Sequence, residues 1–182
     1  MYGEIVILAM LRQRPQHGYE IKKSIDQVFG GTVALNNKVL YPALKHFEEV
    51  GAVVRQVVQQ EGKPNRHIYD LTERGIELLQ ASLRDFPASQ ASNDAEFFTR
   101  VAFFDYLEVP EREAILTSRQ SYLEGCLSYL QTMQHLADTQ DCANTSGVSM
   151  SHAQRVLAFH TRRIHDEYAW IASWLEEMQA SR

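Results

Sequence analysis

The feature that most limits the folds open to this chain is a pair of short β-type segments with helical segments before and after them in the sequence. Residues 52–60, AVVRQVVQQ, form a β-branched alternating run, and residues 66–71, RHIYDL, follow it after the turn EGKPN. Alternation on both sides of a Gly/Pro turn predicts an antiparallel hairpin. The return segment is expected to place His67, Tyr69 and Leu71 on one face, with His67 and Tyr69 in the core.

Three helices are predicted before the hairpin, at about residues 3–12, 18–29 and 38–50. Their apolar residues recur at steps near three and four, which is the helical period. The third helix presents one clean stripe of Leu40, Leu44 and Phe47. In the first two helices the inward residues are expected to be Ile5, Leu8, Leu11, Tyr19, Ile21 and Ile25.

The ends of the third and fourth helices carry recognisable signals. Asn36 and Asn37 are good capping residues before the third helix, and Gly51 is a natural residue to end it. Pro42 lies inside that helix, where it removes a backbone hydrogen bond, so the helix is expected to start late or to bend there. Thr72 is expected to cap the fourth helix.

The order helix–helix–helix–hairpin–helix within residues 3–86 is that of a winged helix-turn-helix, in which the third helix enters the DNA major groove. A small α+β domain without a ligand is the alternative. The net charge of −5 argues against a protein that coats nucleic acid by charge alone. Residues 1–86 carry 11 Lys/Arg and 10 Asp/Glu, whereas residues 87–182 carry 7 and 13, so an anionic partner is expected to meet the first half.

Three segments carry a more specific signal: HGYEIKKSI (17–25), VLYPALKHFEEVGAV (39–53) and GKPNRHIYDLTERGIELL (62–79). In order and spacing they resemble the PadR family of bacterial transcriptional regulators. That family carries His-Gly-Tyr-Glu-Ile, then Leu-Tyr-Pro-Ala-Leu, then a basic wing ahead of Tyr-x-Leu-Thr-x-x-Gly. The resemblance covers nearly all of residues 3–80, and it accounts for Pro42 because the family has a proline at that place.

The length of the chain is similar to that of the longer branch of the family, which has an all-helical C-terminal domain. We therefore expect a mainly α protein with a small β-hairpin wing, in which a winged helix-turn-helix is joined to a helical dimerisation domain. The expected parts are a DNA-binding domain at 1–86, a linker at 87–94 and a helical domain at 95–182. The chain departs from the family in two places. The residues that lead into the third helix are Asn36-Asn37-Lys38, and the wing carries few basic residues.

The expected DNA contacts lie on the third helix and the wing. Lys38, Tyr41 and Lys45 lie off the buried stripe and share one helix face, from which they would reach phosphates or base edges. Asn36 and Asn37 stand at the helix start, where backbone N–H groups favour phosphate and an asparagine can pair with adenine. On the wing the expected contacts are Lys63, Asn65 and Arg66, and the alternative is solvated charges on a turn.

The second half is predicted to hold two long helices around the loop 138–149. One opens at Pro110 and the other spans about 151–180. Along both helices, apolar residues recur about every 3.5 residues and form a seam, a pattern that is typical of coiled-coil packing. For the last helix this seam, proposed for dimerisation, consists of Leu157, Ile164, Tyr168, Ile171, Leu175 and Met178. Burial of both seams within one monomer is the alternative to the homodimer that the family resemblance implies.

Aromatic residues gather in the same half. Residues 94–107, DAEFFTRVAFFDYL, are expected to form a short helix, and Trp170 and Trp174 lie four residues apart on the last one. Phe98, Trp170 and Trp174 are candidates for an effector pocket, because founding members of the family sense phenolic acids. A small aromatic effector is the expected ligand, and ordinary core packing is the alternative.

No P-loop, GxGxxG, HExxH or GxSxG motif occurs, so we expect no enzyme activity, no cofactor and no metal. Two cysteines without a CxxC, and no apolar run long enough for a membrane span, favour a cytoplasmic protein with no membrane partner. The expected partners are double-stranded DNA and a second copy. A repressor is the first hypothesis; an activator with the same contacts, or a winged-helix protein-interaction module, is the alternative.

Overall fold

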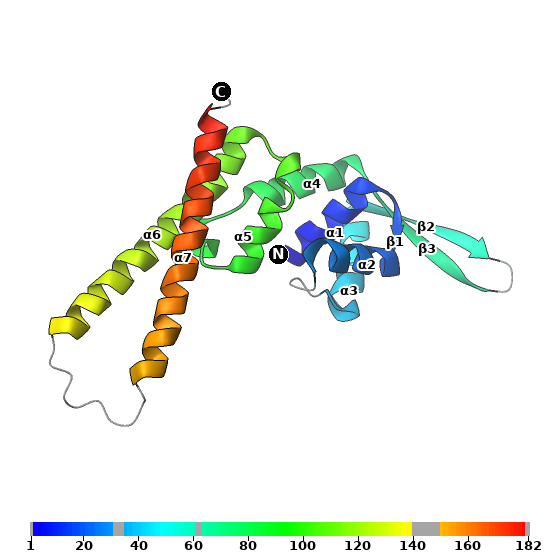
Figure 1. Ribbon diagram of the computed structural model, residues 1–182. Coiled ribbons are helices and arrows are strands. Elements are labelled where there is room, and N and C mark those ends of the chain that lie inside the picture. The colour runs from blue at the N-terminus through cyan, green and yellow to red at the C-terminus, as the bar shows by residue number, and fades with distance from the viewer. Residues whose placement is uncertain (1, 31–34, 61–62, 140–149, 181–182) are drawn as a thin grey trace. The chain divides into compact units, whose positions relative to one another are not determined.

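The computed structural model describes residues 2–30, 35–60, 63–139 and 150–180. The chain forms two compact units, Met1–Phe86 with Asn93–Glu108, and Pro87–Ser92 with Val109–Arg182. The first unit contains the winged helix-turn-helix, and the second contains a pair of long helices (Figure 1).

Helix α1 (Tyr2–Gln13) is the centre of the first unit. Every residue from Ile5 to Leu11 is buried, so this helix is apolar on all sides. Such a helix belongs in the middle of a core, and α1 contacts α2, α3, α4, α5 and β3. The predicted buried stripe of Ile5, Leu8 and Leu11 is too narrow, because other helices surround α1.

Helix α2 (Gly18–Phe29) begins and ends where the sequence predicts. The backbone N–H of Tyr19 donates to His17 Nδ1 at 3.1 Å, and that of His17 donates to a Glu20 carboxylate oxygen at 3.1 Å. This reciprocal pair is a capping box built on histidine. Gly30 ends the helix at φ 55°, a left-handed conformation that favours glycine.

Helix α3 (Asn37–Glu49) is capped by Asn36, whose side-chain oxygen accepts from the Val39 N–H at 3.1 Å. It buries Leu40, Leu44 and Phe47, which confirms the predicted stripe. The expectation that Pro42 delays the start of this helix is wrong. The helix begins at Asn37, one residue earlier than predicted, because the asparagine cap satisfies its first turn.

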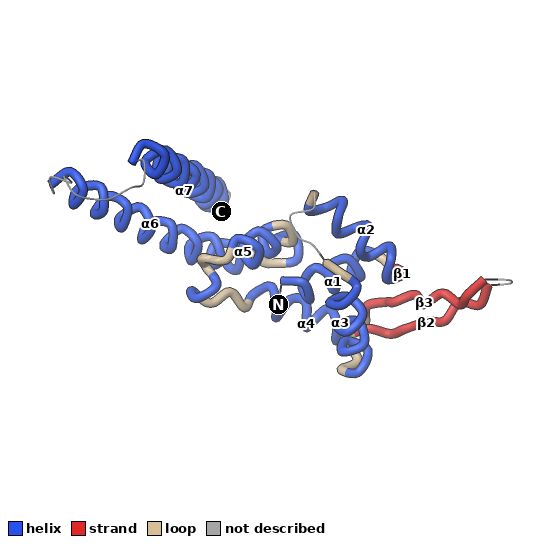
Figure 2. The backbone as a smooth tube through the Cα atoms, turned by 90° about the horizontal axis from the view of Figure 1, so that it is seen from below, coloured by secondary structure: helices blue, strands red, loops and turns tan. Residues whose placement is uncertain are grey.

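The hairpin consists of β2 (Val53–Gln60) and β3 (Lys63–Leu71), paired from Val53↔Leu71 to Gln60↔Lys63. A two-residue strand that the sequence did not predict, β1 (Gln16–His17), pairs with β3, so the antiparallel order is β1-β3-β2. The tube drawing in Figure 2 shows β2 and β3 projecting beyond the helices of their unit. Of the two residues predicted to be core, Tyr69 is buried and His67 is half-buried.

Helix α4 (Glu73–Arg84) begins after Thr72, whose hydroxyl accepts from the Gly75 N–H at 3.1 Å. A Cβ atom at Gly75 would overlap the Ala52 carbonyl oxygen and lie 2.6 Å from Leu71 Cδ1. At Gly125, a helical glycine of the second unit, no described atom lies within 4 Å of a Cβ position. These two glycines therefore differ sharply in the space around them.

Replacing Gly75 with alanine is expected to destabilise the first unit by about 1–3 kcal/mol, because a backbone carbonyl has to move. The matched change Gly125→Ala is expected to be neutral, or to stabilise the second unit by up to about 1 kcal/mol. Urea unfolding followed by circular dichroism measures both. Equal effects of the two alanines would contradict this account of the α4 contact.

Helix α5 (Asp94–Val101) and the 3₁₀ turn Phe104–Tyr106 belong to the first unit. The sequence predicted one helix over 94–107 as part of the C-terminal domain. The helix instead ends at Val101, and Phe97, Phe103, Phe104 and Leu107 are buried in the first unit. The predicted linker 87–94 contains a second 3₁₀ turn, Ala88–Gln90, which belongs to the second unit.

The second unit is built on α6 (Val109–Thr139) and α7 (Met150–Ala180), which pack against each other. Arg119 is buried between them, where its Nε donates to a Glu167 carboxylate oxygen at 2.7 Å and its Nη1 donates to the Ala91 carbonyl at 2.6 Å. Figure 1 shows the two helices crossing and then separating toward residues 139 and 150. Most of the predicted loop 138–149 lies outside the described residues.

Candidate nucleic-acid interface

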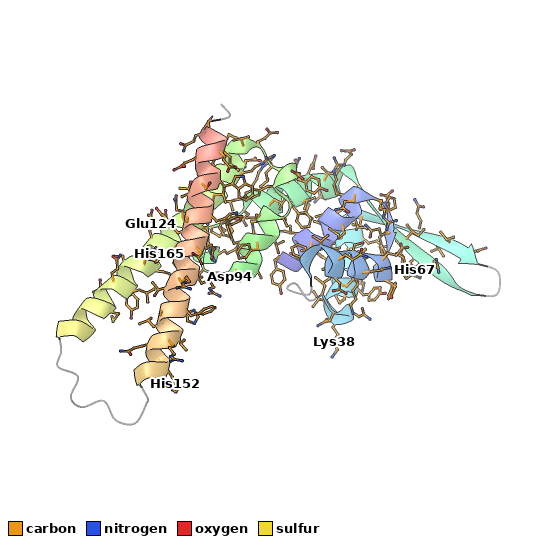
Figure 3. The ribbon with its side chains drawn as sticks, viewed as in Figure 1. Lys38, His67, Asp94, Glu124, His152 and His165 are labelled. Carbon is orange, nitrogen blue, oxygen red and sulfur yellow. The ribbon has the colours of Figure 1, made fainter. Side chains whose placement is uncertain are left out.

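The exposed side of α3 lies opposite its buried stripe. Lys38, Tyr41 and Lys45 are all exposed, so the structure brings these three predicted residues onto one solvent-facing surface. Figure 3 shows the Lys38 side chain projecting away from the unit at the start of α3. Lys45 Nζ lies 3.7 Å from Glu49 in an exposed pair that contributes little stability. Both ammonium groups are therefore accessible to an anion.

The two asparagines before this face have different roles. Asn36 uses its side-chain oxygen to cap α3, which leaves only its amide donors for a ligand. Asn37 is the first residue of the helix, and its side chain is exposed. Of the pair, Asn37 is thus better placed to read a base.

Tyr41 connects α3 to the start of α2. A Cβ atom at Gly18 would lie 3.0 Å from Tyr41 Cε1 and 3.2 Å from its hydroxyl oxygen. The ring therefore rests on the bare glycine backbone while 43% of the residue stays exposed. This contact holds the phenol at the junction of the two helices.

Tyr19 lies next to this junction and is 70% exposed, so its predicted inward orientation is wrong. It lies two residues before the buried Ile21, and residues two apart on a helix do not share a face. That spacing was visible in the sequence. Tyr19 joins Tyr41 as an aromatic residue on the exposed side of the helix-turn-helix.

The wing carries a basic residue that was not predicted as part of the site, Arg55. Arg55 of β2 pairs with Glu48 of α3, with Nε and Oε1 3.3 Å apart, and this pair ties the wing to the helix. Arg66 is exposed on β3, opposite Val58. The side chains of Lys63 and Asn65 lie outside the described residues. The wing thus presents at least one accessible guanidinium, that of Arg66.

Tyr69 shows how this wing is anchored. The residue is buried at the base of the hairpin, and burial raises the pKa of its phenol although the nearby Arg55 guanidinium opposes the shift. The phenol therefore stays neutral at ordinary pH, and Tyr69 is a core residue. Exposed charges of the wing lie farther out, where they are accessible.

The residues predicted for dimerisation lie on the side of α7 that faces α6. Ile171 is fully buried within one chain, and the Tyr168 hydroxyl donates to a Glu124 carboxylate oxygen at 2.9 Å. Ile164, Leu175 and Met178 are half-buried, and Leu157 is exposed. A contact between two copies through these residues stays a prediction.

The residues predicted for an effector pocket belong to different units. Phe98 is on α5 and stacks edge-on with Phe97, with ring centroids 5.1 Å apart. Trp170 and Trp174 are on α7 with centroids 5.4 Å apart, and with Ser173 and Glu177 they line a shallow hollow of about 270 Å³. A pocket shared by Phe98 and the two tryptophans stays a prediction.

Among the residues that the structure describes, no cluster of three or more His, Cys, Asp or Glu side chains could hold a metal ion. None of the described helices is both long enough and apolar enough to cross a membrane.

Comparison with known proteins agrees with this geometry. Residues 7–81 match the model of the transcriptional regulator PadR-like family. No curated protein matches the chain. The match to the family model spans α1 from its second turn through most of α4, including the exposed face of α3 and the wing.

Several solved structures are similar. One is PadR of Bacillus subtilis in complex with operator DNA, 23% identical, covering 96% of this chain and 98% of that one, with a TM-score of 0.45. The same protein in complex with p-coumaric acid is 21% identical over 98% and 96%, with a TM-score of 0.41. The putative transcriptional regulator TA0346 of Thermoplasma acidophilum is 32% identical over 43% and 75%, with a TM-score of 0.37.

Proposed function

Since residues 7–81 form a domain of the PadR-like family of transcriptional regulators, we propose that this chain regulates transcription by binding double-stranded DNA in the cytoplasm. Helix α3 would enter the major groove, and the wing would follow the adjacent backbone. The observation that carries the proposal is the exposed face of Lys38, Tyr41 and Lys45 beside the basic wing. Lysines in such a position bind phosphates, and side chains at the helix start read base edges.

The proposed regulator is a homodimer on a palindromic operator. A two-fold protein matches inverted half-sites about 10 base pairs or a multiple apart. The second unit supports this, because it exposes large apolar side chains on both long helices, among them Tyr129, Val156 and Phe159. Exposed apolar surface of this kind is typical of an interaction site.

The first hypothesis for the direction of control is repression. A dimer that occupies a promoter excludes the polymerase from it, and no additional surface is needed. Activation with the same DNA contacts is the alternative, and the position of the operator relative to the promoter separates the two.

The proposal is tested by incubating the full-length protein with sheared DNA from the genome that encodes it and sequencing the fragments that are retained. The expected result is enrichment of fragments that share an inverted repeat. A variant with alanine at Lys38, Lys45 and Arg66 should lose this enrichment. If the variant and the wild type retain the same fragments, or if neither enriches any, the winged domain serves a protein partner instead.

A further inference from the structure

Arg55 lies at the junction of the wing and α3. It is the third residue of β2, and its Nε lies 3.3 Å from a carboxylate oxygen of Glu48 on α3. The side chain of Arg55 is 43% exposed and that of Glu48 is 36% exposed, so water reaches both charges. Ion pairs with this much exposure contribute little to stability. The pair therefore calls for an explanation other than the free energy of folding.

Backbone hydrogen bonds hold the root of the wing. The Ala52 N–H donates to the Phe47 carbonyl at 2.8 Å, and the Thr72 N–H donates to the Ala52 carbonyl at 3.1 Å. The Thr72 hydroxyl also donates to the Gly51 carbonyl at 2.8 Å. Because these bonds already fix the segment between α3 and β2, the main effect of the ion pair is on the direction of the Arg55 side chain.

Glu48 occupies only one edge of the Arg55 guanidinium, the edge at Nε. Within the described part of the chain, neither Nη atom of Arg55 donates a hydrogen bond to the protein. A guanidinium presents its donors as a planar fork that matches the oxygens of a phosphate. Arg55 therefore has two donors that are held in place and accessible to an anion.

The ion pair lies on the side of α3 that carries the candidate interface. Glu48 is three residues after Lys45 and seven after Tyr41, and these spacings place the three side chains on one side of a helix. Burial raises the pKa of the Tyr69 phenol, and the Arg55 guanidinium opposes the rise. Tyr41 and Glu48 act on the same phenol, so these groups gather around it. The Arg55 guanidinium is thus a neighbour of the exposed face of α3.

The ion pair has no net charge, and this limits how it acts on DNA. An unpaired arginine attracts any duplex through its charge, whatever the sequence. A guanidinium paired with a carboxylate adds little attraction at a distance, but its free donors still bind a phosphate that lies against them. Such a group stabilises only a duplex that is seated in one position. It therefore favours correctly docked DNA over loosely bound DNA.

We propose that Arg55 binds a backbone phosphate of the operator and that Glu48 is the positioning residue that holds the guanidinium for this contact. The inference rests on the proposed function and deepens it, because it adds a phosphate contact between α3 and the wing. Glu48 then improves discrimination between duplexes, although its own charge repels DNA.

Arg55→Ala tests the phosphate contact in the full-length protein. Fluorescence anisotropy would compare a duplex carrying the enriched inverted repeat with a scrambled duplex at several salt concentrations. Affinity for the repeat should fall about tenfold or more, and the slope of log K against log salt should flatten by about one per protomer.

Arg74→Ala is the matched control for this variant. Arg74 is an exposed arginine of α4 that lines a hollow with His46 and Val50, on another side of α3. Its replacement should change affinity for the repeat less than about threefold. Equal losses from Arg55→Ala and Arg74→Ala would overturn the proposed contact.

The double variant Arg55→Ala with Glu48→Gln separates a lost contact from an exposed carboxylate. It should bind the repeat at least about fivefold more weakly than the wild type, because no fork remains for the phosphate. Full recovery in the double variant would show that Arg55 only masks the charge of Glu48, and would overturn the contact. Urea midpoints close to that of the wild type are expected for these variants, because the pair is exposed.

Glu48→Gln tests positioning through the ratio of the affinities for repeat and scramble, which a purely structural role would not change. Without the carboxylate, Arg55 attracts any duplex and has to be immobilised on binding, so the ratio should fall about threefold or more. Glu77→Gln removes the same charge from an exposed position on α4 and should leave the ratio unchanged. Equal ratios for the two glutamine variants would overturn the role of Glu48.

Failure of this inference is distinguishable from failure of the proposed function. A wild-type chain that enriches no repeat, or binds both duplexes equally, would overturn the proposed function and this inference together. A wild-type chain that binds the repeat specifically, and does so equally well after Arg55→Ala, would overturn this inference alone.

Discussion

Alanine at both Lys38 and Lys45 is expected to weaken operator binding at least about 100-fold, since each dimer loses four charge-assisted contacts to DNA. Both ammonium groups are exposed on the same side of α3, and the ion pair of Lys45 with Glu49 is itself exposed. The slope of log K against log salt should fall by about one for each lost phosphate contact, or about four per dimer. Fluorescence anisotropy at several salt concentrations measures both quantities.

The control for this pair is alanine at Arg12 and Arg14, which removes the same charge from exposed positions outside α3 and the wing. Its effect should be limited to the general loss of positive charge, less than about fivefold in affinity at physiological salt, where such charges are screened. Equal losses for the two pairs would show that α3 has no special role in binding DNA.

Replacing Arg100 with methionine is expected to cost the first unit about 3–5 kcal/mol of unfolding free energy. The guanidinium is 1% exposed. Its Nη1 donates to the Glu96 carboxylate at 2.6 Å, and its Nη2 donates to the Asp85 carbonyl at 2.7 Å. Methionine would leave the buried carboxylate without its cation and that carbonyl without its donor.

The same arginine joins three helices. It extends from α5 to the end of α4, while the other carboxylate oxygen of Glu96 accepts from the Tyr2 N–H of α1 at 3.1 Å. Loss of Arg100 should therefore loosen the packing of α5 on the winged domain. Urea unfolding of the full-length chain, followed by circular dichroism, measures the effect.

Two variants accompany Arg100→Met. Lys45→Ala removes one partner of an exposed pair and should cost at most about 0.5 kcal/mol. Arg100→Met with Glu96→Leu removes both buried charges and should be more stable than Arg100→Met alone, because no unpaired carboxylate remains. A loss from Arg100→Met as small as that from Lys45→Ala would contradict the role assigned to the buried pair.

The elements with strong local signals were predictable from sequence. The bounds of α2 follow from its capping residues and Gly30, and β2 and β3 follow from their alternation around the turn. Strand β1 has only two residues, too few for a pattern, and it exists because β3 offers it an edge. The burial of all of α1 depends on the elements that surround it, which no local period reveals.

The part of the candidate site that lies on one helix was predicted. The contacts of the site that join two elements were not predicted. Lys38, Tyr41 and Lys45 share a face because of helical spacing alone. The Arg55–Glu48 pair joins β2 to α3, and the seat of Tyr41 on Gly18 joins α3 to α2; both depend on the packing of separate segments. The burial of Arg100 was not predicted, because two of the carbonyls that bind it, those of Ser82 and Asp85, come from the end of α4.

If this chain reads a specific DNA sequence, its affinities for two duplexes must differ strongly. Anisotropy would compare the inverted-repeat duplex recovered from the genome with a scrambled duplex of equal length and composition at physiological salt. Binding to the repeat is expected to be at least about 10³-fold tighter than binding to the scramble. Equal, weak and salt-sensitive binding to both duplexes would contradict it.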